Sequence, residues 1–169
     1  MEPEPEIERI INIALVGHVA NGKTTLVEAL TGTNTKRSST EKQTGRTIKL
    51  GYANCTIWRC IECSKVFSSK DPAKCPNCNI PAQKKVTISF VDAPGHHSYI
   101  HTMVKGVTVV DGAILVTDVR REPMQVQTLE HLAILSILDV KNIIVVQNKA
   151  DLVNQQRCLE HYKELKKEL

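Results

Sequence analysis

The sequence has 169 residues, 41% of them hydrophobic, which is the length and apolar content of one α/β domain with its own core. Its 22 Lys and Arg against 18 Asp and Glu give a net charge of +4, which tolerates an acidic partner without requiring one. No apolar run is long enough to cross a membrane, and the acidic start is the opposite of a signal peptide's basic region, so we expect a cytoplasmic protein without membrane contact.

The first part of the chain predicts a tail, a strand, a loop and a helix. Residues 1–9 predict a disordered acidic tail, because proline and glutamate alternate there. Residues 10–16 are typical of a strand, and residues 17–24, Gly-His-Val-Ala-Asn-Gly-Lys-Thr, match the G-x-x-x-x-G-K-[ST] pattern of a phosphate loop. A helix is expected from Lys23 to about Thr31.

This loop carries the chemistry of a triphosphate site. The glycines allow a tight turn in which backbone N–H groups converge on one anion, and the helix N-terminus favours phosphate. Lys23 adds a charge toward the β- and γ-phosphates, and the Thr24 hydroxyl is placed to hold Mg²⁺. A Gly-rich turn that only caps a helix is the alternative. The candidate nucleotide-binding residues here are Gly17, Val19, Ala20, Asn21, Gly22, Lys23, Thr24 and Thr25.

Two C-x₂-C pairs follow a polar loop over residues 33–45 and an extended stretch over residues 47–58. Four thiolates at this spacing suit tetrahedral zinc, and four protein sulfurs leave no open position, so the metal is expected to be structural. We predict a compact zinc-knuckle insertion over residues 59–81, with reduced structural cysteines or a redox pair as alternatives. Cys55 and Cys158 are predicted to be ordinary apolar residues. The four predicted zinc ligands are Cys60, Cys63, Cys75 and Cys78.

The next strand, residues 85–91, runs into Asp92-Ala-Pro-Gly95-His96. An Asp at the end of a strand beside the phosphate loop can reach the Mg²⁺ shell through water, and the Gly95 N–H can contact a γ-phosphate. A helix is expected from His96. His97 and His101 lie one helical turn apart, but no third ligand is near in sequence, so a solvated helix face is favoured over a metal site.

The remaining chain alternates strands and helices. Residues 113–118 predict a buried parallel strand, and Pro123 is expected to open a helix. Apolar residues step along that helix by threes and fours, at Val126, Leu129, Ala133 and Ile137. Residues 143–146 predict a second buried strand, and residues 155–169 a charged amphipathic helix.

The second buried strand ends on an N-K-x-D motif that selects the base. The Asp151 carboxylate can accept two hydrogen bonds from guanine N1–H and its amino group, Asn148 can meet the O6/N7 edge, and the Lys149 stem can cover the base. Adenine would leave the carboxylate unpaired, which disfavours an ATP-using kinase. Strand–helix alternation with ligands at carboxyl strand ends predicts a doubly wound α/β domain over residues 10–169, with a mostly parallel sheet and helices on both faces.

These motifs, in this order, resemble those of the translational GTPases of the elongation factor Tu class. Residues 47–53, the cysteine pairs and residues 147–153 narrow the resemblance to the gamma-subunit family of eukaryotic and archaeal translation initiation factor 2. The resemblance implies a GTPase that uses GTP, Mg²⁺ and structural Zn²⁺, turns over slowly without an activating partner, and carries methionyl initiator tRNA to the small ribosomal subunit. It also implies alpha and beta subunits and nucleotide-exchange factors as partners.

The resemblance assigns roles residue by residue. A first switch covers residues 33–47, and at its end Thr47 closes on Mg²⁺ and γ-phosphate. A second switch runs from Asp92 to about His101, and in it His96 orients the attacking water. The implied catalytic residues are Lys23, Thr47 and His96. Asn21, Arg46, His97 and the short stretch 122–128 depart from the family pattern. Because the family places a last strand, a last helix and two β-barrels further downstream, we expect the domain to be incomplete at its C-terminus.

Three other functions remain open at this stage. A GTP-dependent assembly scaffold would have only incidental hydrolysis, which His96 argues against. A zinc-knuckle nucleic-acid binder would lose RNA affinity on substitution of Cys60 and keep GTP affinity. A selenocysteine-specific elongation factor is the nearest alternative, and the cysteine knuckle disfavours it.

Overall fold

The computed structural model describes residues 9–35, 47–69 and 74–169. Nearly all of the predicted tail, the middle of the predicted first switch and Arg46 lie outside these ranges. Within them, no helix is both long and apolar enough to span a membrane. The elements are β1 (Ile10–Val16), α1 (Lys23–Thr31), β2 (Gly51–Cys60), β3 (Val66–Ser69), β4 (Ala82–Asp92), η1 (His97–Tyr99), α3 (Ile100–Val107), β5 (Gly112–Asp118), α4 (Val126–Ile137), β6 (Ile143–Asn148), η2 (Ala150–Leu152) and α5 (Gln155–Glu168).

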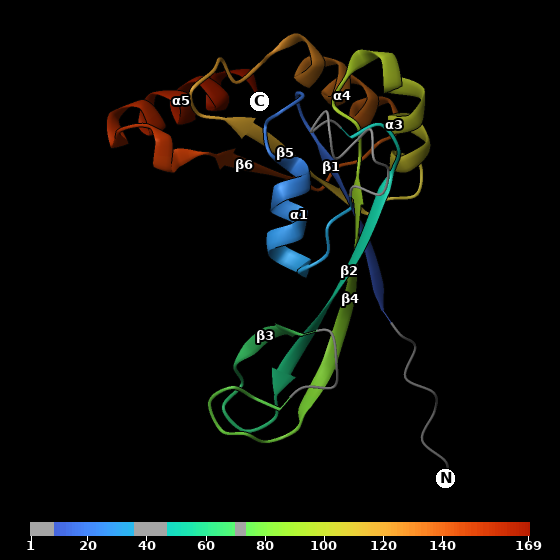
Figure 1. The fold of residues 1–169 in the computed structure, drawn as a ribbon, viewed down its shortest axis with the longest axis vertical. Coiled ribbons are helices and arrows are strands. Elements are labelled where there is room, and N and C mark those ends of the chain that lie inside the picture. Colours follow the sequence, from blue (N-terminus) through green and yellow to red (C-terminus); the bar gives the residue numbers. More distant parts are fainter. Residues whose placement is uncertain (1–8, 36–46, 70–73) are drawn as a thin grey trace.

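One twisted sheet organises the domain and confirms the predicted fold class. Its six strands are ordered β3-β2-β4-β1-β5-β6. The β4–β1, β1–β5 and β5–β6 pairs are parallel, and β2 pairs antiparallel with both β3 and β4. Helix α1 lies on one face of the sheet, and α3 and α4 lie on the other (Figure 1).

Alternation along the central strands divides the core between the two faces. Ile114 and Val116 of β5 pack in one cluster with Val27 of α1, whereas Leu115 packs in the other with Met103 of α3 and Leu135 of α4. All seven residues of β5 are buried, as predicted. Burying each such side chain stabilises the fold by about 1.5–3 kcal/mol, so β5 fixes both layers of helices.

Two elements differ from their predictions in which residues they bury. The strand predicted at 143–146 is β6, but Ile143 and Ile144 are 37% and 61% exposed, because β6 is an edge strand of the described sheet. In α4 the predicted apolar stripe is the exposed one: Val126 is 71% and Ile137 81% exposed. The face that packs on the sheet instead carries Thr128, His131 and Leu135.

Several predicted boundaries shift for local reasons. Pro123 does not open α4; the helix begins at Val126, after Gln125, whose extended backbone accepts hydrogen bonds from the N–H groups of Thr128 and Leu129. Strand β2 begins at Gly51, opposite Asp92 of β4, four residues later than the extended stretch predicted from Thr47. The helix expected from His96 begins with a 3-10 turn. His101 is exposed, as expected of a solvated helix face, and the side chain of His97 lies outside what is described.

A β-ribbon extends from the helical body at the end remote from α3 and α4 (Figure 1). Strand β1 first pairs with β4 at Thr87, so residues 82–86 of β4 pair only with β2. We call residues 57–69 and 74–86, which include the short strand β3, the arm. The buried Trp58 ring holds it together, because its Nε1–H donates to the Ser69 carbonyl at 3.1 Å.

Candidate nucleotide-binding site

The carboxyl ends of four strands meet at one edge of the sheet, which is where open α/β sheets bind ligands. The phosphate loop follows β1, Asp92 ends β4, Asp118 ends β5 and Asn148 ends β6. Parallel pairing places these ends side by side: Leu15 pairs with Asp92, and Asp118 with Asn148. The three predicted motifs, distant in sequence, therefore belong to one site.

The phosphate loop has a backbone that its sequence requires. Gly17 and Gly22 have φ of 129° and 95°, and a Cβ on Gly17 would lie 2.3 Å from the Val116 carbonyl oxygen. The buried Lys23 Nζ donates to the carbonyls of Gly17 at 2.8 Å and His18 at 3.0 Å. Burial lowers the pKa of Lys23 to about 8, although the Asp92 carboxylate acts in the opposite direction. A buried ammonium held inside a backbone turn is suited to binding phosphate.

Hydroxyl and carboxylate oxygens gather beside Lys23 in a set that fits Mg²⁺. The Thr24 hydroxyl donates to Asp92 Oδ2 at 2.6 Å and lies 2.9 Å from the Thr47 hydroxyl oxygen. Thr35 donates to the same Asp92 oxygen at 2.6 Å, and the buried Oδ1 of Asp92 has no hydrogen-bond partner in the described part of the chain. A buried carboxylate oxygen without a partner, next to two hydroxyls, matches the hard oxygen ligands that Mg²⁺ prefers.

Gly95 brings the predicted second switch against the phosphate loop. A Cβ on Gly95 would lie 2.5 Å from Lys23 Nζ and 2.9 Å from the Val19 nitrogen. Only glycine therefore allows this approach of the two loops. His96 follows, partly exposed, with its Nδ1 accepting a hydrogen bond from the Ser98 N–H at 3.3 Å and its ring centroid 6.1 Å from that of Tyr99. Its catalytic role stays a prediction.

The N-K-x-D loop is fastened directly to the phosphate loop. Asn148 Nδ2 donates to the Asn21 carbonyl at 2.8 Å, and Lys149 Nζ donates to the Ala20 carbonyl at 2.7 Å. The Asn21 side chain, which departs from the family pattern, is buried and donates to the Val116 carbonyl at 2.9 Å. Asp151 is exposed at this edge, and Thr25 is exposed on α1. The residues predicted to read the base and those predicted to bind phosphate thus form one framework.

Asp118 is a site residue that the sequence reasoning missed. Its buried carboxylate accepts from Lys149 Nζ at 2.8 Å and from Arg120 Nε and Nη2 at 2.9 and 2.7 Å. The hydrogen bonds from Arg120, and then those from Lys149, hold the pKa of Asp118 well below its usual range. Asp118 therefore orients the lysine of the N-K-x-D motif. Its position at the end of a buried strand was the only signal in the sequence.

His131 was missed as well, and it supports the first glycine of the phosphate loop. The Gly17 N–H donates to His131 Nδ1 at 2.9 Å, and the imidazole is 1% exposed. Burial, with smaller contributions from Lys23 and His18, lowers the pKa of His131 to about 4. The ring is therefore neutral at pH 7 and can accept this hydrogen bond. The signal in the sequence is the spacing of Thr128, His131 and Leu135, which places them on one face of α4.

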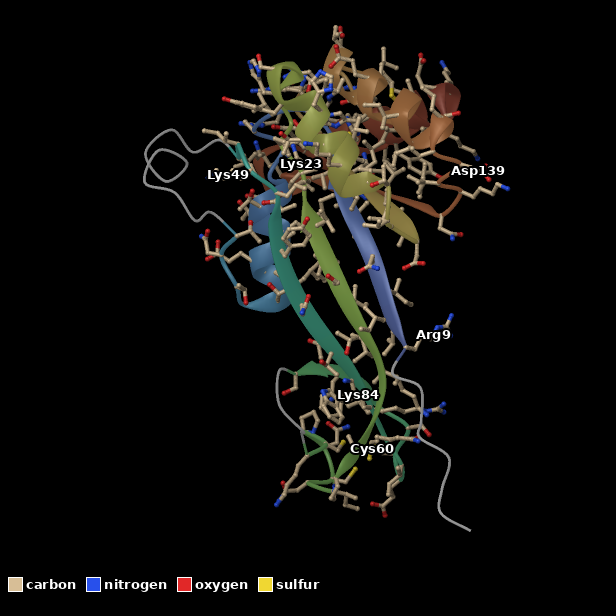
Figure 2. The ribbon with its side chains drawn as sticks, turned by 90° about the vertical axis from the view of Figure 1, so that its right-hand side faces the viewer. Arg9, Lys23, Lys49, Cys60, Lys84 and Asp139 are labelled. Atoms are coloured by element: carbon tan, nitrogen blue, oxygen red, sulfur yellow. The ribbon has the colours of Figure 1, made fainter. Side chains whose placement is uncertain are left out.

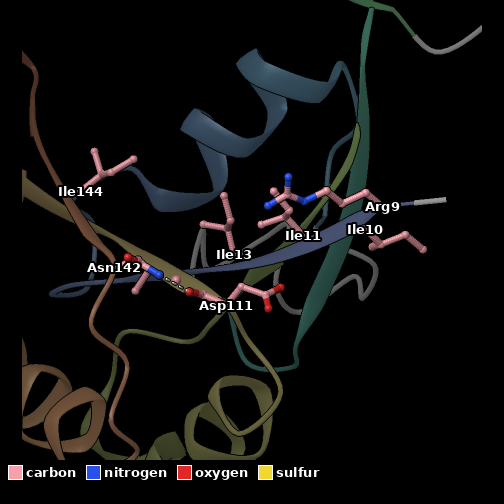
Figure 3. A pocket seen from close by; sticks show the side chains of 9 residues that line it. Arg9, Ile10, Ile11, Ile13, Asp111, Asn142 and Ile144 are labelled. Atoms are coloured by element: carbon pink, nitrogen blue, oxygen red, sulfur yellow. Dashed lines mark hydrogen bonds between the residues drawn. The ribbon is translucent and has the colours of Figure 1, made fainter. Parts of the chain in front are cut away.

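A hollow of about 490 Å³ lies at the opposite, amino-terminal edge of the sheet (Figure 3). Ile10 and Ile13 of β1, Gly112 of β5 and Ile144 of β6 line it, and Asn142 Nδ2 donates to the Asp111 carbonyl at its rim. None of the predicted nucleotide-binding residues lies there.

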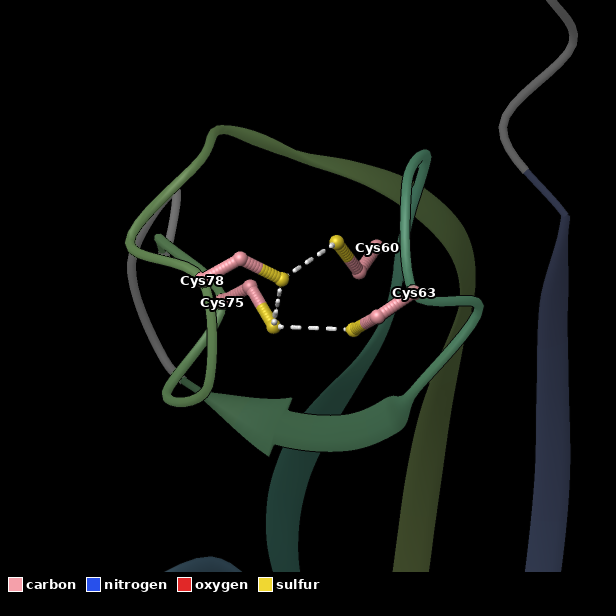
Figure 4. A group of neighbouring side chains, drawn as sticks. All are labelled: Cys60, Cys63, Cys75 and Cys78. Atoms are coloured by element: carbon pink, nitrogen blue, oxygen red, sulfur yellow. Dashed lines mark hydrogen bonds between the residues drawn. The ribbon is translucent and has the colours of Figure 1, made fainter.

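The four predicted zinc ligands converge at the tip of the arm (Figure 4). Their sulfurs lie within 4.8 Å of one another, and three S···S distances are 3.5–3.6 Å. Tetrahedral Zn–S bonds of about 2.3 Å require S···S distances of about 3.8 Å, so the cluster fits the ion closely. Although burial opposes ionisation, hydrogen bonds from the Cys78 and Asn77 backbone N–H groups lower the pKa of Cys75 to about 6, which favours the thiolate that a metal needs.

The two cysteine turns have the same construction. Cys60 and Cys75 each donate their N–H to the carbonyl five residues later, in Lys65 and Ile80, at 2.9 and 2.8 Å. The residue after each second cysteine, Ser64 or Asn79, has a φ of 57°. Of the remaining cysteines, Cys55 is buried in the core as predicted and Cys158 is partly buried outside the cluster.

Comparisons with known proteins agree with this geometry. The family model described as the elongation factor Tu GTP binding domain matches residues 8–169. Proteins named translation initiation factor 2 subunit gamma are similar at 44% identity in Methanosarcina mazei and 42% in Sulfurisphaera tokodaii, over 92% and 96% of this chain. The chain spans 36% and 39% of the length of these relatives.

Two solved structures resemble the fold. A bacterial selenocysteine-specific elongation factor superposes with a TM-score of 0.72 at 30% identity, covering 93% of this chain and 23% of that one. The elongation factor SelB of Methanococcus maripaludis, in complex with the GTP analogue GppNHp, gives 0.64 at 27% identity, covering 95% and 26%.

Proposed function

The chain belongs to the family of the elongation factor Tu GTP binding domain, and on that premise we propose that it is the GTP-binding and GTP-hydrolysing switch domain of a translation initiation factor 2 gamma subunit. The single observation that carries the proposal is the joining of three sequence-distant motifs at one sheet edge, through the Thr24–Asp92, Asn148–Asn21 and Lys149–Ala20 hydrogen bonds. The similarity to relatives of that name supports the choice within the family.

Each residue of the site has a proposed task. Lys23 and the phosphate-loop N–H groups bind the β- and γ-phosphates, while Thr24, Thr47 and, through water, Asp92 hold the metal. Mg²⁺, when bound, neutralises charge on the phosphate oxygens. The Gly95 N–H contacts the γ-phosphate, and His96 orients the attacking water. Loss of the γ-phosphate removes the contacts of Thr47 and Gly95, which releases both switches.

The reaction needs positioning and charge stabilisation and forms no covalent intermediate. His96 is partly exposed, so a partner has access to complete its surroundings. We therefore expect slow turnover until an activating partner contributes. We propose that the whole factor is cytoplasmic and carries methionyl initiator tRNA to the small ribosomal subunit. It assembles with alpha and beta subunits, and an exchange factor replaces its GDP by GTP. The cysteine cluster holds a structural Zn²⁺.

A competition experiment tests the nucleotide assignment. A fluorescent GDP bound to the purified domain should be displaced by GTP and GDP and not by ATP, with one zinc per chain measured on the same sample. The Asp151→Asn variant should lose GDP and gain xanthosine diphosphate, because its amide can donate where the carboxylate accepted. Displacement by ATP as readily as by GTP would refute the proposal.

Two other functions compete with this proposal, a selenocysteine-specific elongation factor and an assembly scaffold. The structural likeness to selenocysteine-specific elongation factors supports that class, but the identities of 27–30% are lower than the 42–44% with the initiation-factor relatives. A scaffold with incidental hydrolysis would keep its single-turnover GTP hydrolysis rate in the His96→Ala variant. We expect that rate to fall by at least a hundredfold.

A further inference from the structure

The positive charge of the chain is concentrated in one segment. Residues 59–85 contain six of the 22 Lys and Arg but only two of the 18 Asp and Glu. Counted without the cysteines, the net charge of this segment equals the +4 of the whole chain, and the remaining residues are balanced. When four thiolates hold one Zn²⁺, the segment still carries +2. This segment forms the arm, and Figure 2 shows Cys60 at the end of the molecule remote from Lys23. The charge lies far from the phosphate loop and is not explained by nucleotide binding.

Two of these charges share a shallow hollow on the arm. Arg59 and Lys85 line it together with Cys60, Ile61, Ser64 and Gln83, and its volume is about 260 Å³. Both cationic side chains are exposed. Lys85 Nζ donates to Oε1 of Gln83, another lining residue, at 2.8 Å. A guanidinium, an ammonium and a hydroxyl around one hollow are the donors that bind a phosphate group.

A β-bulge produces this arrangement. Ile57 pairs with Val86 and Trp58 with Lys84, so Lys85 has no residue opposite it on β2. The extra residue brings Lys85 beside Arg59, which pairs with Gln83. Bulges that redirect one side chain are common beside binding sites.

The basic surface continues around the tip. Lys65 and Lys74 are exposed, and Lys65 Nζ is held by Asn77 Oδ1 at 2.8 Å, a neutral partner that leaves its charge uncompensated. Glu62 is the one acidic residue in the described part of the arm. A ligand that meets all of these residues must carry negative charge along an extended path.

We propose that the arm binds the phosphodiester backbone of RNA, with one phosphate in the hollow formed by Arg59, Ser64, Gln83 and Lys85. A nucleic-acid strand has a permanent negative charge on every nucleotide, which matches cations spread over the tip, and its recognition by Lys and Arg needs no particular sequence. An acidic protein would offer carboxylates only where its own fold places them. The site goes beyond the GTP switch and does not depend on it.

The test measures the anisotropy of a labelled RNA duplex of about 20 base pairs of arbitrary sequence, titrated with the 169-residue chain from about 50 to 200 mM KCl. The Arg59→Gln/Lys85→Gln variant removes two charges from the hollow. The Lys163→Gln/Lys166→Gln variant removes two exposed charges from α5 and is the matched control. Zinc content and the thermal midpoint confirm that both variants fold, and GDP affinity is measured on the same samples.

We expect the hollow variant to bind the duplex about tenfold more weakly at 100 mM KCl, with the slope of log K against log salt smaller by about 2, while the control matches the wild-type chain. GDP affinity should be equal in all three proteins. Equal weakening in both variants, or no RNA binding by the wild-type chain at low salt, would overturn the proposal. Displacement of the RNA by polyglutamate at equal charge would assign the arm to acidic proteins instead. A loss of GDP binding by the wild-type chain would refute the proposed function alone.

Discussion

The two ends of this molecule are built in different ways. At the nucleotide edge, four strand ends are joined by hydrogen bonds between side chains and backbone, such as Lys149 to Ala20 and His131 to Gly17. At the tip of the arm, few apolar side chains are buried, and the two cysteine turns are joined by their sulfurs and by one exposed hydrogen bond, from Lys65 to Asn77. One end is stabilised by the domain core, whereas the other, in our proposal, depends on a metal ion, so each should fail under a different perturbation.

Removing one sulfur should have the largest effect, and only on the arm. Structural zinc supplies about 10 kcal/mol or more of apparent binding free energy, and a small ribbon has little else to hold its tip. Cys75→Ser should therefore lose the zinc completely and make the arm sensitive to protease, with GDP affinity within about twofold of wild type. Cys158→Ser, outside the cluster, is the control. A tenfold loss of GDP affinity in Cys75→Ser would show that the two ends are coupled.

Asp118→Asn should damage only the nucleotide end. The buried carboxylate compensates Arg120 and Lys149, whose side chains are 41% and 24% exposed. Water can therefore solvate the two cations that remain, and losing their hydrogen bonds to Asp118 costs about 1–2 kcal/mol. We expect that loss in the free energy of unfolding, measured by urea titration, and weaker GDP binding because Lys149 is no longer oriented. Zinc content should stay the same. Asp139→Asn, which breaks an exposed pair with Lys141, should cost less than about 0.5 kcal/mol.

Acid should destabilise the nucleotide end through His131. The folded-state pKa of about 4 lies below the unfolded value of 6.5, so the unfolded chain takes up the proton first as the pH falls. The stabilisation is complete above pH 6.5 and is lost toward pH 4, which amounts to about 2 kcal/mol at pH 5. The His131→Gln variant keeps an acceptor for the Gly17 N–H and does not titrate. Between pH 7 and 5 its free energy of unfolding should therefore fall by about 2 kcal/mol less than that of the wild-type chain. Identical pH profiles would contradict this.

The smallest predicted effect is the loss of nucleotide affinity in mild alkali. Phosphate binds the protonated form of Lys23, and burial lowers the pKa of this residue to about 8. GDP affinity should therefore fall about fourfold between pH 7 and 8.5, as the free ammonium loses its proton. Lys23→Met should bind weakly with little pH dependence over that range. A profile equally steep in this variant would assign the change to another group.

The nucleotide end was largely predictable because its motifs are contiguous. Gly17, Lys23, Asp92 and Asn148 each belong to a short pattern whose spacing implies a local backbone, and strand ends in a parallel sheet must meet. Thr35 lies within the predicted first switch but was given no role of its own, and His131 escaped prediction altogether, because nothing in the local sequence distinguishes either residue. Each acts through a contact with a residue more than 50 positions away.

The arm and α4 show where pattern reading fails. The spacing of the four cysteines predicted that they converge. Strand β3 was not predicted, because it has only four residues and no strong alternation, and it forms by pairing with the edge of β2. In α4, Val126 and Ile137 fit an apolar helical stripe, yet the face with Thr128 and His131 is the buried one. His131 accepts a hydrogen bond from the Gly17 N–H there, whereas the buried Thr128 hydroxyl has no hydrogen-bond partner in the described part of the chain. Periodicity predicted the helix and not its orientation.

Strand β4 begins at the cysteine turns and ends on Asp92, and its partner β2 joins the same two places, with Gly51 opposite Asp92 and Cys60 opposite Ala82. Both ends of the ribbon are thus fixed, one by the cysteines and the other by Asp92, and side chains alternate between its faces on either side of the bulge at Lys85. Inserting a single residue into one strand would move the side chains beyond it to the opposite face of the ribbon, unless a further bulge like that at Lys85 absorbs the extra residue. Natural variation in the reach of this ribbon should therefore come in paired increments of about 6.6 Å, two residues per strand at a time.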